Sequence, residues 1–200
     1  RYTLSAMQST HQLYCSDSRR METVSDDSVD LIVTSPPYPM IAMWDDQFAA
    51  DDPGVAAALQ RGDGPAAWEA MHRQLDQVWS ECDQVLKSGG FICVNIGDAT
   101  RTIDGDFRLY SNHSRIISAF ISLGFVQLPA VLWRKPTNSP TKFMGSGMLP
   151  AGAYVTLEHE YVLIFRKGGK RRFTTEHARV SRRRSALWWE ERNQWYSDVW

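Results

Sequence analysis

The sequence predicts an α/β fold with a mostly parallel sheet. Two short apolar runs, Val29–Val33 and Phe91–Ile96, are rich in β-branched residues and indicate buried strands. Between them, apolar side chains recur at helical spacing from Trp68 to Leu86. A strand, a helix and a second strand in this order are typical of a parallel sheet.

The elements before the long helix can be placed in chain order. Tyr14–Ser18 is expected to form a short strand that ends in a polar turn, and Arg19–Val24 one or two helical turns. Residues 39–64 are rich in Asp, Pro, Gly and Ala, so we interpret them as a long functional loop with some helical turns. Pro65 suits the first turn of the helix that follows, which is expected to end near Lys87.

The second half is expected to contribute a helix and two further strands. Ser88-Gly89-Gly90 ends the long helix, and the strand over 91–96 closes in Gly97-Asp98. The helix is expected over 110–123 and the strands over 125–133 and 160–166, with a Pro- and Gly-rich excursion between them. These two strands are expected to pair as an antiparallel hairpin at the edge of the sheet.

A stiff loop, Thr34-Ser35-Pro36-Pro37-Tyr38, follows the first apolar run directly. Each proline fixes φ near −65° and pushes the residue before it toward extended geometry, so Ser35 and Pro36 are held out of the helical region. The Ser35 hydroxyl, the loop carbonyls and the aromatic face of Tyr38 could together hold a planar amino group. The alternative is a Pro-Pro turn that merely ends a strand.

Charge is distributed unevenly, although the formal net charge is only −1. From Asp26 to Asp83 there are 12 acidic residues and two arginines, whereas Arg166–Arg184 holds nine Lys or Arg and one Glu. One part of the protein should repel phosphate and the other attract it. Three cysteines without Cys-x-x-Cys spacing, no signal peptide and no apolar run of about 18 residues indicate a soluble, cytoplasmic protein.

Ser35-Pro36-Pro37-Tyr38 resembles the catalytic Ser-Pro-Pro-Tyr motif of the S-adenosylmethionine-dependent DNA amino-methyltransferases, especially those that methylate the exocyclic N4 of cytosine. Four further segments resemble this family: Cys15–Ser18, Gly89–Asp98, Leu132–Pro136 and Glu158–Lys167. The resemblance implies a Rossmann-like methyltransferase fold with S-adenosylmethionine as the cofactor. It places Asp17, Ser18, Ser35 and Asn95 at the cofactor, because ligands in open α/β sheets bind beyond the carboxyl ends of strands.

The resemblance also implies a mechanism and a partner, double-stranded DNA. A cytosine is swung out of the duplex and stacks on Tyr38, while the Ser35 hydroxyl and the Pro36 carbonyl accept hydrogen bonds from its amino group. Ser35, Pro36, Pro37 and Tyr38 are thus the catalytic residues. The candidates for phosphate contact are Arg171, Arg172, Arg182, Arg183 and Arg184.

Each of these assignments has a simpler structural alternative. Asp17 could be a turn or cap residue, Asn95 a polar residue that ends a strand, and the basic run a solvated surface. His159 stands between two glutamates, but neighbours on a strand point to opposite faces, so no metal site is expected. None of the cysteines follows a proline, which argues against the cysteine nucleophile of the C5-cytosine methyltransferases.

The glycine-rich cofactor loop of the family has no convincing counterpart here. Gly145-Ser146-Gly147 has glycine spacing but follows no apolar strand, and only 34 residues precede Ser35. The sequence therefore resembles the permuted class, in which the catalytic half comes first. We expect an incomplete fold, a fragment or one half of a split enzyme, that needs a complementing C-terminal segment with the cofactor loop.

The sequence favours an N4-cytosine DNA methyltransferase of a prokaryotic restriction-modification system. Residues 1–167 would be the catalytic part, and 168–200, basic and then aromatic, the start of a DNA-recognition region. The alternatives are an N6-adenine DNA methyltransferase, a non-catalytic DNA-binding module derived from such an enzyme, and an RNA or protein amide methyltransferase. Motif order and the basic run argue against the last.

Overall fold

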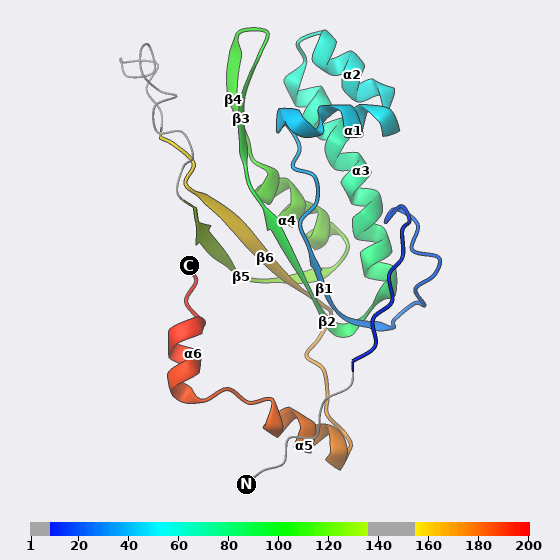
Figure 1. Ribbon diagram of the computed structural model, residues 1–200, viewed down its shortest axis with the longest axis vertical. Helices are drawn as coiled ribbons and strands as arrows, with labels where there is room; N and C mark the ends of the chain where they lie inside the picture. The colour runs from blue at the N-terminus through cyan, green and yellow to red at the C-terminus, as the bar shows by residue number, and fades with distance from the viewer. Residues whose placement is uncertain (1–8, 136–154) are drawn as a thin grey trace.

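A four-stranded mixed sheet with helices against it forms the centre of the computed structural model, which describes residues 9–135 and 155–200 (Figure 1). The helices are α1 (Asp45–Asp51), α2 (Pro53–Gln60), α3 (Gly64–Val85), α4 (Asn112–Ser122), α5 (Glu176–Arg184) and α6 (Trp189–Trp195), with a 3₁₀ turn, η1 (Ala42–Trp44). The strands are β1 (Val29–Thr34), β2 (Leu86–Ile96), β3 (Ala99–Ile103), β4 (Asp106–Tyr110), β5 (Phe125–Arg134) and β6 (His159–Lys167).

The strand order in the main sheet is β1-β2-β6-β5. β1 pairs with β2 in parallel, whereas β6 runs antiparallel to both of its neighbours. The α/β class and the antiparallel hairpin at one edge are therefore confirmed. Because β6 is inserted between β2 and β5, only one of the three pairings is parallel, fewer than a mostly parallel sheet implies.

The core lies between one face of this sheet and helices α3 and α4. The ring of Phe120 on α4 stacks on Phe165 of β6 at 4.4 Å between centroids and lies 5.1 Å from Trp79 of α3. Each of these three side chains is almost fully buried. The helix predicted from Pro65 to about Lys87 is confirmed as α3, because its apolar residues at helical spacing form the side that packs on the sheet.

Two parts of the N-terminal half differ from expectation. Tyr14–Ser18 is not a strand, and 19–24 forms isolated turns rather than a helix; both Leu13 and Tyr14 are exposed, and a strand needs a partner and an apolar face. The expected loop over 39–64 is largely helical, as η1, α1 and α2. Asp52 caps α2 by accepting from Gly54 N at 2.8 Å, and Pro53 starts the helix.

A second sheet, the hairpin β3–β4, was not expected from the sequence. Its turn holds Asp104 and Gly105 at φ of 48° and 78°, the left-handed pair of a tight two-residue hairpin. The hairpin rises beside α2 and α3 in Figure 1. The Pro- and Gly-rich excursion, including Gly145-Ser146-Gly147, lies largely outside the described residues.

The two edges of the main sheet differ. On β5, Leu132 N donates to Asp198 O at 2.8 Å and Trp200 N donates to Leu132 O at 3.0 Å, so residues 198–200 extend the sheet by a short bridge. On β1, among the described residues, β2 is the only strand neighbour. Leu31 and Val33 of β1, on the face away from α3, are 54% and 73% exposed.

Candidate active site

The Ser-Pro-Pro-Tyr segment leaves the sheet at the carboxyl end of β1. The parallel register pairs Val33 with Cys93 and Thr34 with Val94, which brings Ser35 beside Asn95 near the end of β2. Ser35 is exposed, and Tyr38 is partly buried against the edge of the core. The strand therefore delivers a hydroxyl and an aromatic ring to the same corner of the sheet.

The Tyr38 hydroxyl is the centre of this corner. It lies 3.4 Å from Ser35 Oγ, accepts from Asn95 Nδ2 at 2.8 Å and donates to Glu160 Oε2 at 3.0 Å. Asn95 Nδ2 also donates to Glu160 Oε2 at 2.7 Å, while Asn95 Oδ1 is buried and has no hydrogen-bond partner among the described residues. The sequence-predicted residues Ser35, Tyr38 and Asn95 are thus in one network.

Glu160, at the start of β6, and Lys135, just after β5, complete the network. Lys135 Nζ donates to Glu160 Oε1 at 2.6 Å and lies 4.2 Å from the centroid of the Trp133 ring. Burial alone raises the pKa of Glu160, but the hydrogen bonds from Lys135, Asn95 and Tyr38 outweigh it, so the pKa falls below its ordinary value. Glu160 is therefore a carboxylate in the neutral pH range.

The Tyr38 hydroxyl stays protonated in this setting. Burial, and then the charge of Glu160, raise the pKa of Tyr38 to about 12, against the opposing hydrogen bond from Ser35. Gly97 lies close to one edge of the ring, and a Cβ there would lie 3.1 Å from Tyr38 Cε2, so a side chain at this position would push the ring by a few tenths of an ångström. The ring is consequently held at its hydroxyl and along one edge.

Asn112, the first residue of α4, anchors the chain that follows Tyr38. Its Nδ2 donates to Pro39 O and to Gly97 O, both at 3.0 Å. Its Oδ1 accepts from Trp68 Nε1 at 2.7 Å and lies 3.0 Å from His72 Nε2. This fully buried amide therefore joins the loop, the end of β2 and α3.

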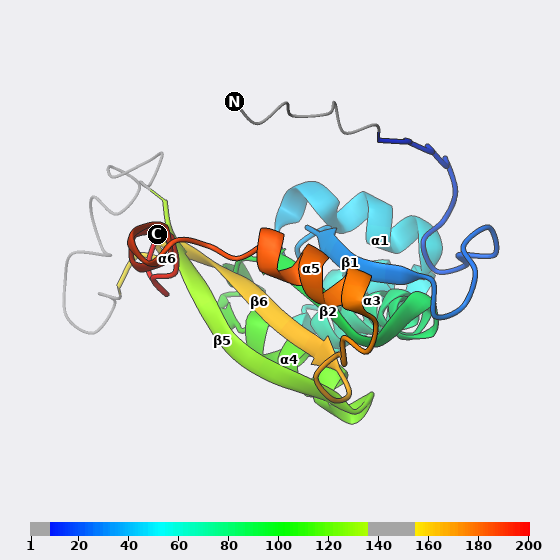
Figure 2. The ribbon, with the colours of Figure 1, turned by 90° about the horizontal axis from the view of Figure 1, so that it is seen from below.

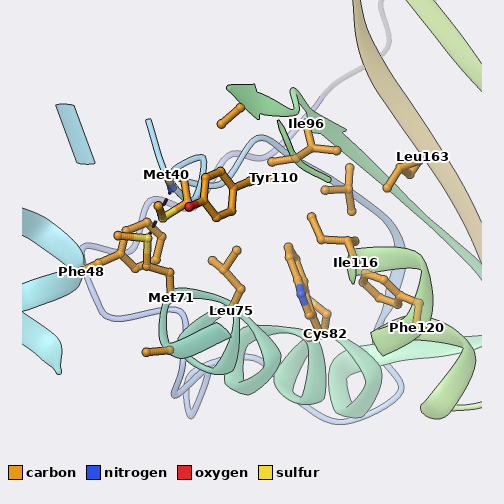
Figure 3. Packing of buried hydrophobic residues seen from close by; sticks show 14 of the residues in the cluster. Met40, Phe48, Met71, Leu75, Cys82, Ile96, Tyr110, Ile116, Phe120 and Leu163 are labelled. Atoms are coloured by element: carbon orange, nitrogen blue, oxygen red, sulfur yellow. Dashed lines mark hydrogen bonds between the residues drawn. The ribbon is translucent and has the colours of Figure 1, made fainter. Parts of the chain in front are cut away.

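The next loop residue, Met40, is fixed from the other side. Its φ of 66° is a left-handed backbone conformation that non-glycine residues seldom adopt, and its side chain is 1% exposed. Met40 N lies 3.4 Å from Met71 Sδ, and Figure 3 shows Met40 packed with Met71 and Phe48. Such strain persists where surrounding packing compensates it, as it does here.

His72 makes the fold sensitive to acid. Burial lowers its pKa from 6.5 to about 4, so the ring is neutral near pH 7 and its Nε2–H donates to Asn112 Oδ1. The unfolded chain takes up this proton near pH 6.5 and the folded chain only near pH 4. The contribution of His72 to the free energy of unfolding is therefore fully present above pH 6.5. It falls by about 3 kcal/mol as the pH drops to 4.

We expect His72→Gln to flatten this loss, because the amide can donate to Asn112 without taking up a proton. Urea unfolding between pH 7 and pH 4 measures it: the free energy of unfolding of the wild type should fall more steeply than that of the variant, by about 2–3 kcal/mol. His177→Gln, on exposed helix α5, is the matched control and should follow the wild type. Parallel curves for His72→Gln and the wild type would contradict the assignment.

Asp17 and Ser18 lie in a separate hollow of about 100 Å³ that Pro37 also lines. Asp17 is in a turn rather than at a strand end: Arg20 N donates to Asp17 O, and the Arg19 guanidinium bonds its carboxylate. These hydrogen bonds from Arg19 lower the pKa of Asp17. The hollow that Asp17 and Ser18 line includes neither Ser35 nor Asn95, and Asn95 lines a different hollow.

The basic residues are not brought to the Tyr38 corner. Arg171 forms an ion pair with Asp30, near the amino end of β1, and Arg182 lies 5.0 Å over the Phe173 ring. Arg183 and Arg184 end helix α5 and, like Arg172, are exposed. In Figure 1, α5 lies at the end of the sheet opposite α1 and α2, and Figure 2 shows it crossing in front of β1 and β2.

An apolar hollow of about 390 Å³ lies beside the corner, on the face of the sheet away from α3. It is lined by Val33, Cys93, Asn95, Trp133, Val162 and Trp200. Burial raises the pKa of Cys93, and that of Cys82 to about 12, so neither thiol is an activated nucleophile. Among the described residues there is no candidate metal cluster, and no helix combines the length and apolar character that crossing a membrane requires.

Three residues of the site were not assigned a role from sequence. Glu160 and Lys135 stand in segments that resemble the family, but pairing of β5 with β6 is needed to place both beside Tyr38. Asn112 is the first residue of α4 and stands where a helix start is expected. Its contacts with Pro39 and Gly97 depend on how α4 packs, which no local pattern specifies.

A Ser-Pro-Pro-Tyr corner at the carboxyl end of an α/β sheet defines a class, the DNA amino-methyltransferases. A DNA methylase family model, that of the N6 and N4 methyltransferases, matches residues 29–200. The chain belongs to this DNA methylase family.

Two curated relatives of this chain are named as type II methyltransferases. The chain is 52% identical over 195 residues to the type II methyltransferase M.MthZI of Methanothermobacter thermautotrophicus, covering 97% of this chain and 55% of that protein. It is 45% identical over 201 residues to the type II methyltransferase M.MjaI of Methanocaldococcus jannaschii, covering 95% and 66%. The chain thus spans between half and two thirds of the length of these relatives.

Solved structures agree on the fold. A protein of Thermus thermophilus described as a DNA modification methylase, complexed with S-adenosyl-L-methionine, matches with a TM-score of 0.66 at 28% identity. The match covers 92% of this chain and 65% of that one. The cytosine-N4-specific PvuII DNA methyltransferase matches with a TM-score of 0.54 at 20% identity, over 76% and 48%, which shows a shared fold. The Rossmann-like methyltransferase fold is therefore confirmed.

Proposed function

We propose that this chain is the catalytic part of a site-specific DNA methyltransferase that transfers a methyl group from S-adenosylmethionine to the exocyclic N4 of cytosine. The observation that carries the proposal is the corner of Ser35, Tyr38 and Asn95 at the carboxyl ends of β1 and β2. The relatives' names, type II methyltransferases, support a role in a prokaryotic restriction-modification system, and hence in the cytoplasm.

The residues present fit part of the proposed cofactor. Asp17 and Ser18 line a hollow with a carboxylate and a hydroxyl, groups that suit the hydroxyl and amino groups of a nucleoside. Asn95 Oδ1 is a buried acceptor without a partner among the described residues, and Asn95 also lines the apolar hollow beside the corner. The hollow of about 100 Å³ is smaller than the 300–1,000 Å³ typical of ligand pockets, so these residues would form one wall.

The chain's own groups would bind and orient the base. The cofactor, when bound, supplies an electrophilic methyl group. The exposed Ser35 hydroxyl and the Pro36 carbonyl accept from the two amino hydrogens of a cytosine that has left the duplex, and the Tyr38 ring stacks on it. These hydrogen bonds draw the nitrogen lone pair out of conjugation with the ring, and fixed positioning supplies much of the acceleration.

Serine at position 35 supports cytosine N4 over adenine N6 as the target. The test uses the complete enzyme, the protein encoded by the full reading frame that contains this chain. It is incubated with DNA and tritium-labelled S-adenosylmethionine, and the digested nucleosides are separated. Label in N4-methylcytosine is expected; label in N6-methyladenine would establish the alternative target, and no label would favour a non-catalytic DNA-binding module.

We propose that a complementing segment with the glycine-rich cofactor loop packs against β1. Support comes from the exposed Leu31 and Val33, from the edge of β1 that has no strand neighbour among the described residues, and from the greater length of the relatives. The isolated 200 residues should therefore bind S-adenosylmethionine poorly. Titration calorimetry tests this, and micromolar affinity of the isolated chain would contradict it.

Residues 168–200 are proposed to begin the DNA-recognition region, with Arg172 and Arg182–Arg184 on phosphates. In Figure 1, α5 lies beyond the amino end of β1, whereas Ser35 follows its carboxyl end. Contacts from α5 would therefore fall on phosphates away from the flipped base. Arg171 is the weakest candidate, because its ion pair with Asp30 already engages its charge.

We expect the triple change of Arg182, Arg183 and Arg184 to alanine to weaken DNA binding in a salt-dependent way. The slope of log K against log salt should decrease by about 2–3, since each phosphate contact contributes about 0.9. Fluorescence anisotropy at several salt concentrations measures this. Changing the exposed Arg61 and Arg73 of the acidic part to alanine is the matched control; an unchanged slope in the triple variant would mean that α5 faces solvent.

A further inference from the structure

Glu160 ends a chain of hydrogen bonds that reaches the base-binding hydroxyl of Ser35. The chain runs from Ser35 Oγ to Tyr38 Oη at 3.4 Å and from Tyr38 Oη to Glu160 Oε2 at 3.0 Å. Its last member is 18% exposed and is bonded to Lys135 Nζ at 2.6 Å. Ser35 is the exposed member of the chain and stands at the end where a base would bind.

The carboxylate fixes the direction of every bond in this chain. An ionised Glu160 can only accept, so the single Tyr38 hydroxyl proton points to it. Asn95 Nδ2 donates to one Tyr38 lone pair at 2.8 Å. The remaining lone pair can only accept, so the Ser35 hydroxyl donates its proton to Tyr38, and the lone pairs of Ser35 Oγ remain for a ligand.

We propose that Glu160, held by Lys135, is a specificity-determining positioning residue that makes Ser35 an obligatory hydrogen-bond acceptor. An acceptor at this point takes an amino group and opposes a carbonyl oxygen, which is what distinguishes cytosine from uracil at ring position 4. This inference rests on the proposed function. It adds that the preference for an amino group over a carbonyl oxygen is controlled from Glu160 of β6, which is two hydrogen bonds away from Ser35 and three from the base.

A neutral group at position 160 would remove this control. The side chain of Glu160→Gln has nearly the same shape, but its amide can donate to Tyr38 Oη. Tyr38 could then donate to Ser35, and the Ser35 hydroxyl would be free to donate to a carbonyl oxygen. Tyr38→Phe interrupts the chain at its centre and keeps the aromatic ring, so it should have the same consequence by a different route.

The experiment compares binding of two duplexes by the complete enzyme. They carry the recognition site, mapped by sequencing of methylated DNA, with cytosine or uracil at the target position. The target faces an abasic site in both, so that the cost of leaving the helix is nearly equal. If mapping shows an adenine target, adenine and hypoxanthine replace the pair, because the argument concerns the amino group and not the ring.

The wild type is expected to bind the cytosine duplex on the order of 10- to 100-fold more tightly than the uracil duplex. Glu160→Gln and Tyr38→Phe should each reduce this ratio by about threefold or more, while the Pro36 carbonyl, which can only accept, keeps part of it. The double variant should lower it no further, since both changes break one chain. Glu158→Gln is the matched control: Glu158 pairs with Arg134 at 3.7 Å on the surface and should keep the wild-type ratio.

The outcomes separate this inference from the proposed function. If the wild type transfers no methyl group to DNA, the proposed function fails first. If the wild type methylates DNA but does not discriminate, or if folded Glu160→Gln and Tyr38→Phe both retain its discrimination, the inference is overturned and the function stands. Circular dichroism of each variant establishes that it is folded.

Discussion

Ser35→Ala and Tyr38→Ala are each expected to abolish methyl transfer by the complete enzyme while DNA affinity stays within about threefold. Ser35→Ala removes the side-chain acceptor for the amino group, and loss of one preorganised hydrogen-bonding group lowers rates by about 10²–10³-fold. Tyr38→Ala removes the stacking ring and also the partner of Ser35, Asn95 and Glu160. Tritiated-methyl incorporation and anisotropy measure the two quantities separately.

Matched controls are Ser122→Ala on the exposed side of α4 and Tyr14→Ala, whose ring is 54% exposed. Both control variants should transfer methyl groups to DNA at the wild-type rate. Ser35 is exposed, so Ser35→Ala should not change the unfolding midpoint, and its loss of activity cannot be attributed to unfolding. Methyl incorporation that survives both Ser35→Ala and Tyr38→Ala would refute the catalytic assignment.

Asn112→Leu is expected to have the largest effect on stability, about 3 kcal/mol or more. Asn112 is fully buried and uses both amide atoms: without it the carbonyls of Pro39 and Gly97 and the ring nitrogens of Trp68 and His72 lose their partner. Methyl transfer should fall as well, because the loop after Tyr38 loses its anchor. Urea unfolding and single-turnover methylation measure both.

Asn193→Leu on α6 is the control for this substitution, because that side chain is exposed and its loss should change stability by less than about 0.5 kcal/mol. A free energy of unfolding for Asn112→Leu within about 1 kcal/mol of the wild type would show that the amide is not the anchor. Full activity in a destabilised variant would show that the loop holds its place by packing of Met40 alone.

The main sheet could be predicted because its signals are local. The run from Val29 to Val33 is rich in β-branched residues, and two prolines after it exclude both a helix and a longer strand. The hairpin β3–β4 also had a local signal, Asp104-Gly105 between alternating residues, which is typical of a two-residue turn. Tyr14–Ser18 has residues that are common in strands, but no described strand pairs with it. Whether a segment finds a partner strand depends on the rest of the fold and cannot be predicted from that segment alone.

In the candidate site, too, the residues that depend on local patterns could be predicted from the sequence, and those that depend on long-range pairing could not. Ser35, Tyr38 and Asn95 follow from strands that end at one edge, which topology brings together. Glu160 and Lys135 enter through an antiparallel pairing that places residues 25 apart in sequence at 2.6 Å. Asp17 was expected in the same crevice, but the hollow that it lines includes none of Ser35, Tyr38 and Asn95.

The short bridge of residues 198–200 on β5 has a consequence for assembly. It occupies the outer amide and carbonyl groups of Leu132 and the amide of Arg134, so the end of this edge already has hydrogen-bond partners. The edge of β1 has no such partner among the described residues. A strand that pairs there would lie directly beside the strand that carries Ser35.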